Sequence, residues 1–108
     1  MNVTSEIEKI KNIIVNTIPI EKLYLFGSYA YGAPSENSDY DFYAVIPNNT
    51  IRPTEAIFEI YKATGRIERK PMDILAGTAE VFERRSKLLT MEREICEKGV
   101  VLYDRQQH

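Results

Sequence analysis

Isoleucines near the N-terminus recur at the spacing of an amphipathic helix. They stand three or four positions apart, with mostly polar or charged residues between them: Ile7, Ile10, Ile14 and Ile18. One face of an α-helix repeats at this interval. Ser5 and Glu8 have the spacing of a capping box, in which two side chains satisfy the first backbone N–H groups. The pattern predicts a helix over residues 5–17 that ends before Pro19.

Four shorter segments have the apolar and β-branched character of strands. KLYLF, residues 22–26, is an apolar and aromatic run closed by Gly27, as expected of a strand buried on both faces. DYDFYAVI, residues 39–46, stops at a proline followed by two asparagines. KPMDILAG, residues 70–77, and VVLY, residues 100–103, are the other two predicted strands.

Start and stop signals mark three more helices between these strands. The first begins at Pro53 and ends at Gly65, the second is capped by Thr78, and the third ends near Gly99. Their predicted apolar positions are, in that order, Ile57, Ile60 and Tyr61; Val81 and Phe82; and Leu88, Met91 and Ile95. The order of elements predicts an α/β or α+β sheet with helices packed on it.

Length and composition are those of one globular domain. The 108 residues leave room for one modest core and for no separate substrate-binding domain, so we expect a single domain over residues 1–108. The apolar share of 44% and charged share of 28% argue against disorder. No apolar run approaches the roughly 18 residues that cross a bilayer, and the N-terminus lacks the apolar block of a signal peptide. We expect a cytoplasmic protein with no membrane partner.

Charge and cysteine content narrow the expected partners. The net charge of -2 and a pI near 5.5 are a poor match for a phosphate backbone, so nucleic acid is not the expected partner. A protein partner, or a small anionic substrate bound together with metal, fits this balance better. Cys96 is the only cysteine, which excludes an internal disulfide and a multi-cysteine zinc site. Its helical spacing from apolar neighbours predicts a packing role.

Three aspartates lie within or beside the predicted strands. Asp39 and Asp41 alternate along one strand, so their Cα atoms lie about 6.6 Å apart on one face and their oxygens can converge on a cation. Asp73 is the only charge within a later apolar segment, and it could complete the cluster or accept a proton from an attacking hydroxyl. Carboxylate oxygens are the ligands that Mg²⁺ prefers. Each feature alone is more typical of a solvated edge or a structural aspartate.

A glycine and serine turn precedes the paired aspartates. Gly27 would let the backbone approach a phosphate closely, and the Ser28 hydroxyl with nearby N–H groups could hold phosphate oxygens. Gly32 follows four residues later, and Ser38 stands directly before Asp39. A lone Gly-Ser pair is usually only a turn, so it is the combination of this turn with the three aspartates that indicates a nucleotide and metal site.

Taken together, these motifs resemble a known family. GSYAYGAPSENSDYD, residues 27–41, with MDIL at 72–75, is similar to the signature of the DNA polymerase beta superfamily of nucleotidyltransferases, and within it of the minimal nucleotidyltransferases. The C-terminal TMEREICEKGVVLYDR is similar to the ending of those domains. One position departs: Tyr31 stands where many members carry a basic residue. For Tyr31, stacking on a base or ribose and a partly exposed packing role both stay open.

The resemblance implies a mixed sheet flanked by helices, like the polymerase beta palm, and a site with defined roles. ATP would be the nucleotide donor, with Gly27, Ser28, Gly32 and Ser38 as its binding residues. Two Mg²⁺ ions would bind Asp39 and Asp41, and Asp73 would share a metal and activate the acceptor hydroxyl. The reaction implied is in-line attack on the α-phosphorus with loss of pyrophosphate.

The resemblance also suggests an acceptor. Minimal nucleotidyltransferases of this kind are similar to the antitoxin half of two-component systems whose toxin is a helical HEPN-domain protein, and they transfer AMP to a tyrosine of that toxin. We therefore expect protein adenylylation and a complex with the toxin. Two alternatives stay open at this point: neutralisation of the partner by contact alone, and nucleotidyl transfer to tRNA or a small hydroxylated molecule.

Overall fold

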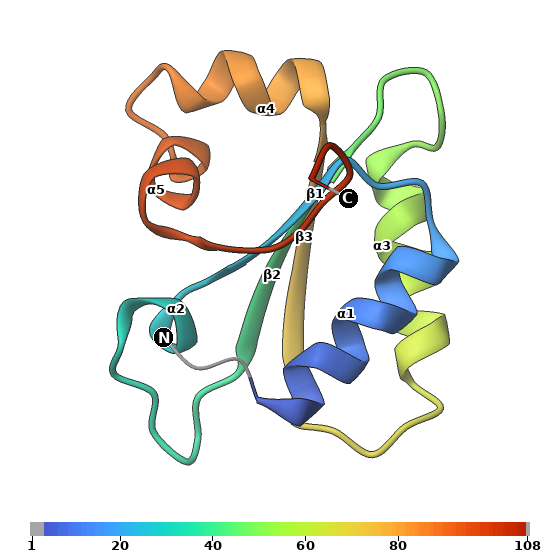
Figure 1. Ribbon diagram of the computed structural model, residues 1–108, viewed down its shortest axis with the longest axis vertical. Coiled ribbons are helices and arrows are strands. Elements are labelled where there is room, and N and C mark those ends of the chain that lie inside the picture. The colour runs from blue at the N-terminus through green and yellow to red at the C-terminus, as the bar shows by residue number, and fades with distance from the viewer. Residues whose placement is uncertain (1–3, 108) are drawn as a thin grey trace.

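The computed structural model describes residues 4–107, which form a four-stranded mixed sheet and five helices (Figure 1). In chain order the elements are α1 (Ser5–Thr17), β1 (Lys22–Phe26), α2 (Ser28–Tyr31), β2 (Tyr40–Ile46), α3 (Pro53–Thr64), β3 (Met72–Thr78), α4 (Ala79–Ser86), α5 (Met91–Lys98) and β4 (Val100–Asp104). The strand order is β3-β2-β1-β4, with β2 and β3 parallel and the other pairs antiparallel. The predicted α+β class, a mixed sheet flanked by helices, is confirmed.

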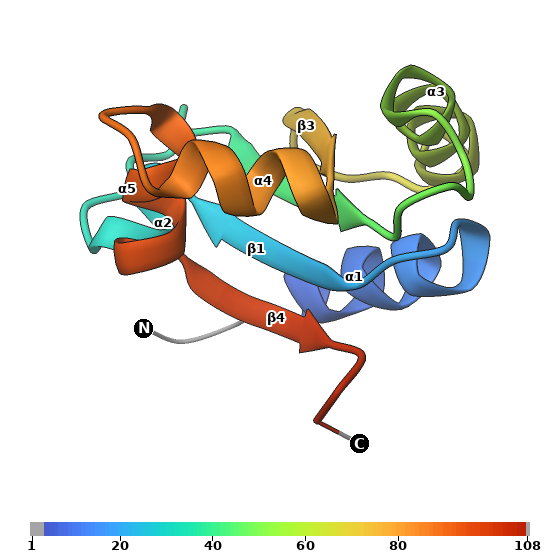
Figure 2. The ribbon, with the colours of Figure 1, turned by 90° about the horizontal axis from the view of Figure 1, so that it is seen from above.

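Helices cover both faces of the sheet (Figures 1 and 2). α1 and α3 pack their apolar stripes on one face, where Ile10 and Ile60 join Phe42 in the larger buried cluster. α4 and α5 cover the other face, where Phe82 and Ile95 pack against aromatic residues of β1 and β2. Successive side chains of a strand point to opposite faces, so each central strand contributes to both clusters. Among residues 4–107, no helix combines the length and apolarity that crossing a bilayer requires.

Several predicted boundaries and burial patterns differ from the structure. β2 begins at Tyr40, so Asp39 precedes the strand and is exposed. Leu88 lies outside α5, and both Leu88 and Met91 have more than half of their surface exposed. Cys96 is exposed too, because only Ile95 of its helix turns fully toward the sheet. The predicted stripe on α5 was therefore wrong at two of its three positions, although the helix itself is present.

The predicted capping box at the start of α1 was also wrong. Thr4, and not Ser5, is the N-cap residue, and its hydroxyl accepts a hydrogen bond from the Ile7 N–H at 3.2 Å. We expect Thr4→Ala to lower the free energy of unfolding by about 1 kcal/mol, because the N–H loses its acceptor. Ser5→Ala, the matched control one residue later, should change it by only a few tenths. Urea denaturation measures both, and equal effects would contradict the assignment of the cap.

Candidate functional site

Two of the predicted aspartates face each other across the parallel strand pair. Asp41 of β2 and Asp73 of β3 are register partners, and Phe26 of β1 is the partner of Asp41 on its other side. Neighbouring strands are about 4.8 Å apart, and register partners in a sheet share a face. The face is the one covered by α4 and α5, because Asp41 alternates with the buried Phe42 on the opposite side. The sheet therefore places the carboxylates of Asp41 and Asp73 beside each other.

The environment of Asp41 is acidic and partly desolvated. Burial is the largest cause that raises the pKa of Asp41, followed by the charges of Asp73 and Asp39. Asp39 thus contributes its charge from just outside the strand. Among residues 4–107, none of these three carboxylates hydrogen bonds to a side chain or pairs with a lysine or arginine. Protonation or a bound cation would relieve their repulsion.

The residues present fit a divalent cation by chemistry. Asp39, Asp41 and Asp73 supply hard oxygen ligands without a protein counter-charge, which is the donor set that Mg²⁺ prefers. In the present side-chain positions, no three acidic, histidine or cysteine groups within residues 4–107 enclose an ion. Asp39 and Asp73 are exposed, so their side chains are free to rotate. The positions of their backbones therefore decide which carboxylates can bind the same ion.

Gly27 brings the backbone of the turn against the carboxylate of Asp41. It has φ 73° and ψ -158°, and it forms the N-cap of the short helix α2. A Cβ atom at this position would lie 2.2 Å from Asp41 Oδ2, so no side chain fits between the turn and the carboxylate. Ser28, the first residue of α2, is half-buried. The predicted nucleotide-binding turn and the predicted metal-binding aspartate are therefore in direct contact.

Gly32 and Ser38 shape the loop that connects α2 to β2. Gly32 ends α2 with φ 98°, in a left-handed conformation, and a Cβ atom there would meet no neighbour within 4 Å. The Ser38 hydroxyl accepts a hydrogen bond from the Ser35 N–H at 2.8 Å, which closes a tight turn in the loop. Among residues 4–107, the hydrogen bonds of these two residues are local to α2 and the loop that follows it.

Tyr31 lies at the edge of the site, at the end of α2. Burial, the charge of Glu94 and the charge of Asp41 all raise the pKa of the Tyr31 phenol, while a hydrogen bond with the Gly27 backbone lowers it. The phenol is therefore close to the turn, to α5 and to the carboxylates. Tyr31 is 43% exposed. This placement is compatible with both roles that the sequence leaves open, contact with a base or ribose and partly exposed packing.

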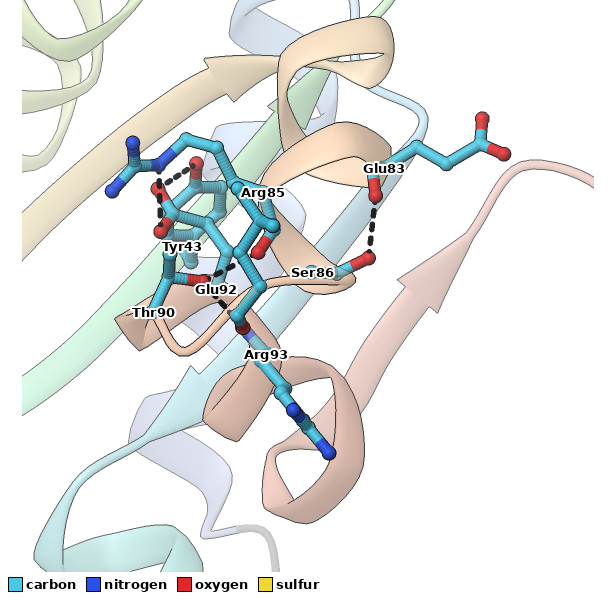
Figure 3. Close-up of polar contacts among 8 residues, drawn as sticks. Tyr43, Glu83, Arg85, Ser86, Thr90, Glu92 and Arg93 are labelled. Atoms are coloured by element: carbon cyan, nitrogen blue, oxygen red, sulfur yellow. Dashed lines mark hydrogen bonds and ion pairs between the residues drawn. The ribbon is translucent and has the colours of Figure 1, made fainter.

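A polar network fixes α4 and α5 over the site face (Figure 3). The Tyr43 hydroxyl, two residues beyond Asp41, donates to Glu92 Oε2 at 3.3 Å, and Arg85 of α4 pairs with the same carboxylate at 3.0 Å. Gly77 of β3 makes room for this hydroxyl, since a Cβ atom there would lie 2.4 Å from it. Burial is the main cause that raises the pKa of Tyr43, with the Glu92 charge next. The network anchors both helices to β2.

Sequence reasoning missed one polar contact beside the aspartates. Tyr61 was predicted on the apolar stripe of α3, but it is 38% exposed, and its hydroxyl bonds to the backbone of β3 on both sides of Asp73. Periodicity predicts which face of a helix a side chain lies on. It does not predict which groups a tyrosine hydroxyl contacts. A tyrosine at the border of an apolar stripe was the one available signal.

Comparison with known families gives one match. The family model described as polymerase beta, nucleotidyltransferase, matches residues 8–108. No curated protein sequence matches the chain. The matched region includes the Gly27 turn and all three aspartates, so the residues of the candidate site lie within it.

Solved structures share the fold at low sequence identity. A candidate nucleotidyltransferase from Sulfolobus solfataricus is 19% identical, with a TM-score of 0.59 over 93% of this chain and 78% of that chain. A toxin–antitoxin structure with AMP-PNP is 22% identical, with a TM-score of 0.55 over 96% and 77%. A mutant of the MntA–HepT toxin–antitoxin pair is 20% identical, with a TM-score of 0.53 over 92% and 73%. At these identities the likeness shows a common fold.

Proposed function

The chain belongs to the polymerase beta nucleotidyltransferase family, and from that premise we propose that it transfers AMP from ATP to a hydroxyl acceptor in a Mg²⁺-dependent reaction. The acceptor we propose is a tyrosine of a HEPN-domain toxin, so that the chain acts as an antitoxin by protein adenylylation. Two structures of similar fold come from toxin–antitoxin pairs, one of them with AMP-PNP. They support the choice of donor and partner.

The observation that carries the proposal is the row formed by Gly27, Asp41 and Asp73. Strand register sets the two carboxylates side by side, and the glycine turn touches one of them. A nucleotide whose phosphates lie on this turn would therefore meet the carboxylates directly. Phosphoryl chemistry needs this proximity, because positioned charge supplies most of the catalysis in such reactions.

The three aspartates differ in how deeply they are buried, and we assign their roles on that basis. Asp41 is the innermost carboxylate and is flanked by the other two, so it would be the central metal ligand, with Asp39 as the second. Mg²⁺ bound there would neutralise phosphate charge and stabilise the negative charge that develops on the attacking and leaving oxygens. Asp73 is exposed on an edge strand, where an incoming acceptor hydroxyl can reach it.

The proposed transfer forms one bond to phosphorus, breaks another, and moves one proton to a residue of this chain. The acceptor oxygen forms a bond to the α-phosphorus of ATP, the bond from that phosphorus to the bridging oxygen breaks, and pyrophosphate leaves with the electron pair. The acceptor proton passes to the Asp73 carboxylate. Tyr31, exposed beside the turn, lies where it can contact the base or ribose of the donor, or the incoming acceptor.

A transfer assay tests the proposal. Purified protein is incubated with ATP labelled at the α-phosphate and Mg²⁺, with and without a HEPN-domain protein as the acceptor. We expect label and a mass increase of one AMP on that protein, and neither with the Asp39→Ala, Asp41→Ala double variant. Tight binding with no transferred label would contradict adenylylation and favour neutralisation by contact. Label on tRNA and none on protein would contradict the proposed acceptor.

A further inference from the structure

Asp73 sits near the start of an edge strand. Among residues 4–107, β3 pairs only with β2, and Asp73 is its second residue. Backbone groups point alternately to the two sides of a strand. The Pro71 carbonyl accepts a hydrogen bond from the Tyr40 N–H of β2. Asp73 is two residues further along, so its backbone N–H and carbonyl also face β2. Those of Met72 and Ile74 face outward, where a further strand would otherwise pair.

The hydroxyl of Tyr61 hydrogen bonds to these outward-facing backbone groups. Tyr61 of α3 donates to the Met72 carbonyl at 3.2 Å and accepts from the Ile74 N–H at 3.0 Å. The carbonyl belongs to the peptide group before Asp73, and the N–H belongs to the peptide group after it. The two peptide planes that meet at the Asp73 Cα are thus held by a single oxygen atom. These planes set the direction in which the Asp73 side chain leaves the strand.

We propose that Tyr61 is a positioning residue for nucleotidyl transfer, whose hydroxyl fixes the backbone on both sides of Asp73 and so aims its carboxylate at Asp41 and the acceptor. The inference rests on the proposed function of Asp73. Within the described residues 4–107, the Tyr61 hydroxyl hydrogen bonds only to the outward backbone groups of β3, so we assign it no contact with the reacting atoms. The effect therefore passes entirely through Asp73.

The geometry explains why a tyrosine stands here instead of an apolar residue. α3 packs on the sheet through Ile60 and Ala56, which are fully buried, whereas Tyr61 lies one position further round the helix and is partly exposed. Its ring extends past the face to the edge of the sheet. A phenylalanine would keep the ring contacts and lose both hydrogen bonds. Water can then solvate the freed backbone groups, so the expected loss is in alignment more than in stability.

The test compares Tyr61→Phe with Thr64→Val on the same helix. The Thr64 hydroxyl is fully buried, donates to the Ile60 carbonyl at 2.7 Å and accepts from Arg69 in the loop before β3 at 3.5 Å, so its removal deletes one hydroxyl from α3 and no hydrogen bond to β3 itself. Steady-state transfer of AMP to the HEPN-domain protein is measured for both. We expect Tyr61→Phe to lower kcat about ten-fold with the KM for ATP changed less than two-fold. Thr64→Val should leave kcat near the wild-type value.

Two further measurements separate positioning from folding. In the Asp73→Asn background, adding Tyr61→Phe should cause no additional loss of the residual transfer, because the hydroxyl acts through a carboxylate that is already absent. Hydrogen exchange of the Ile74 amide should accelerate in Tyr61→Phe and stay unchanged in Thr64→Val. Faster exchange with unchanged kcat would overturn the positioning role, as would a full additional loss in the Asp73→Asn background.

The wild-type reaction distinguishes this inference from the proposed function. If the wild-type protein transfers AMP and Tyr61→Phe transfers it equally well, the inference is wrong and the function stands. If the wild-type protein transfers nothing to the protein acceptor, the function fails, and a positioning role in that reaction is overturned with it.

Discussion

Asp41→Asn should abolish nucleotidyl transfer, by about 10³-fold or more, and at neutral pH without metal it should raise the temperature of unfolding. The two effects have one cause. The Asp41 carboxylate is partly buried and lies beside the charges of Asp73 and Asp39. Keeping that charge costs stability in the metal-free protein, and the same charge would hold the cation on which the reaction depends. Asparagine has nearly the same shape and carries no charge.

The sign of the pH dependence follows from the direction of the pKa shift. The folded-state pKa of Asp41 is raised above its value of 3.8 in the unfolded chain. Folding therefore favours the protonated form, and wild-type stability is lost as the pH rises through the folded-state pKa. The stability difference between Asp41→Asn and wild type should be small below pH 3.8 and should grow to a plateau above the raised pKa.

Thermal denaturation between pH 3 and pH 8, with a chelator present, measures this difference. Glu36→Gln is the matched control, because Glu36 is an exposed carboxylate in the loop that leads to β2. Mg²⁺ should raise the unfolding temperature of the wild type and of Glu36→Gln, and it should not raise that of Asp41→Asn. An Asp41→Asn variant that is less stable than wild type at pH 7 without metal would contradict the repulsive site described above.

The row of residues at the site was only partly predictable from sequence. Alternation along β2 correctly predicted that Asp41 shares a face with Tyr43 and Val45, because one face of this strand is fully apolar. The pairing of Asp41 with Asp73 was not predictable. It depends on how α3 returns the chain to form a parallel strand, and a shift by one residue would have turned Asp73 to the other face.

Apolar periodicity failed where the covered surface was small. α5 is only eight residues long and turns just Ile95 fully into the core, so the apolar residues at 88 and 91 had no partner surface to cover. The prediction for Tyr61 was wrong for another reason. Tyr61 lies beside the buried stripe of α3, and its hydroxyl bonds to the edge of a sheet that sequence periodicity cannot place. Both wrong predictions depend on how helices and strands pack against one another, which local sequence patterns do not determine.

Gly27→Ala should damage stability and transfer together. The backbone of Gly27 occupies a region with φ 73° and ψ -158° that is essentially restricted to glycine, which costs other residues about 1–3 kcal/mol. An added methyl group would also lie 2.2 Å from Asp41 Oδ2, so the turn or the carboxylate must move. We expect a loss of about 3 kcal/mol in the free energy of unfolding, from strain and overpacking combined. Because the displaced group is Asp41 or the turn proposed to bind phosphate, transfer should fall by about 10²-fold.

Gly32→Ala separates these two causes. Gly32 also has a positive φ, at 98°, but its added methyl group would meet open space. This variant should lose only about 1 kcal/mol from backbone strain and should keep transfer within a few-fold of wild type. Urea denaturation and the labelled-ATP assay measure both variants. Equal loss of transfer in the two would show that the flexibility of the α2 turn matters more than the contact between Gly27 and Asp41, and would remove the main geometric support for a nucleotide site at this turn.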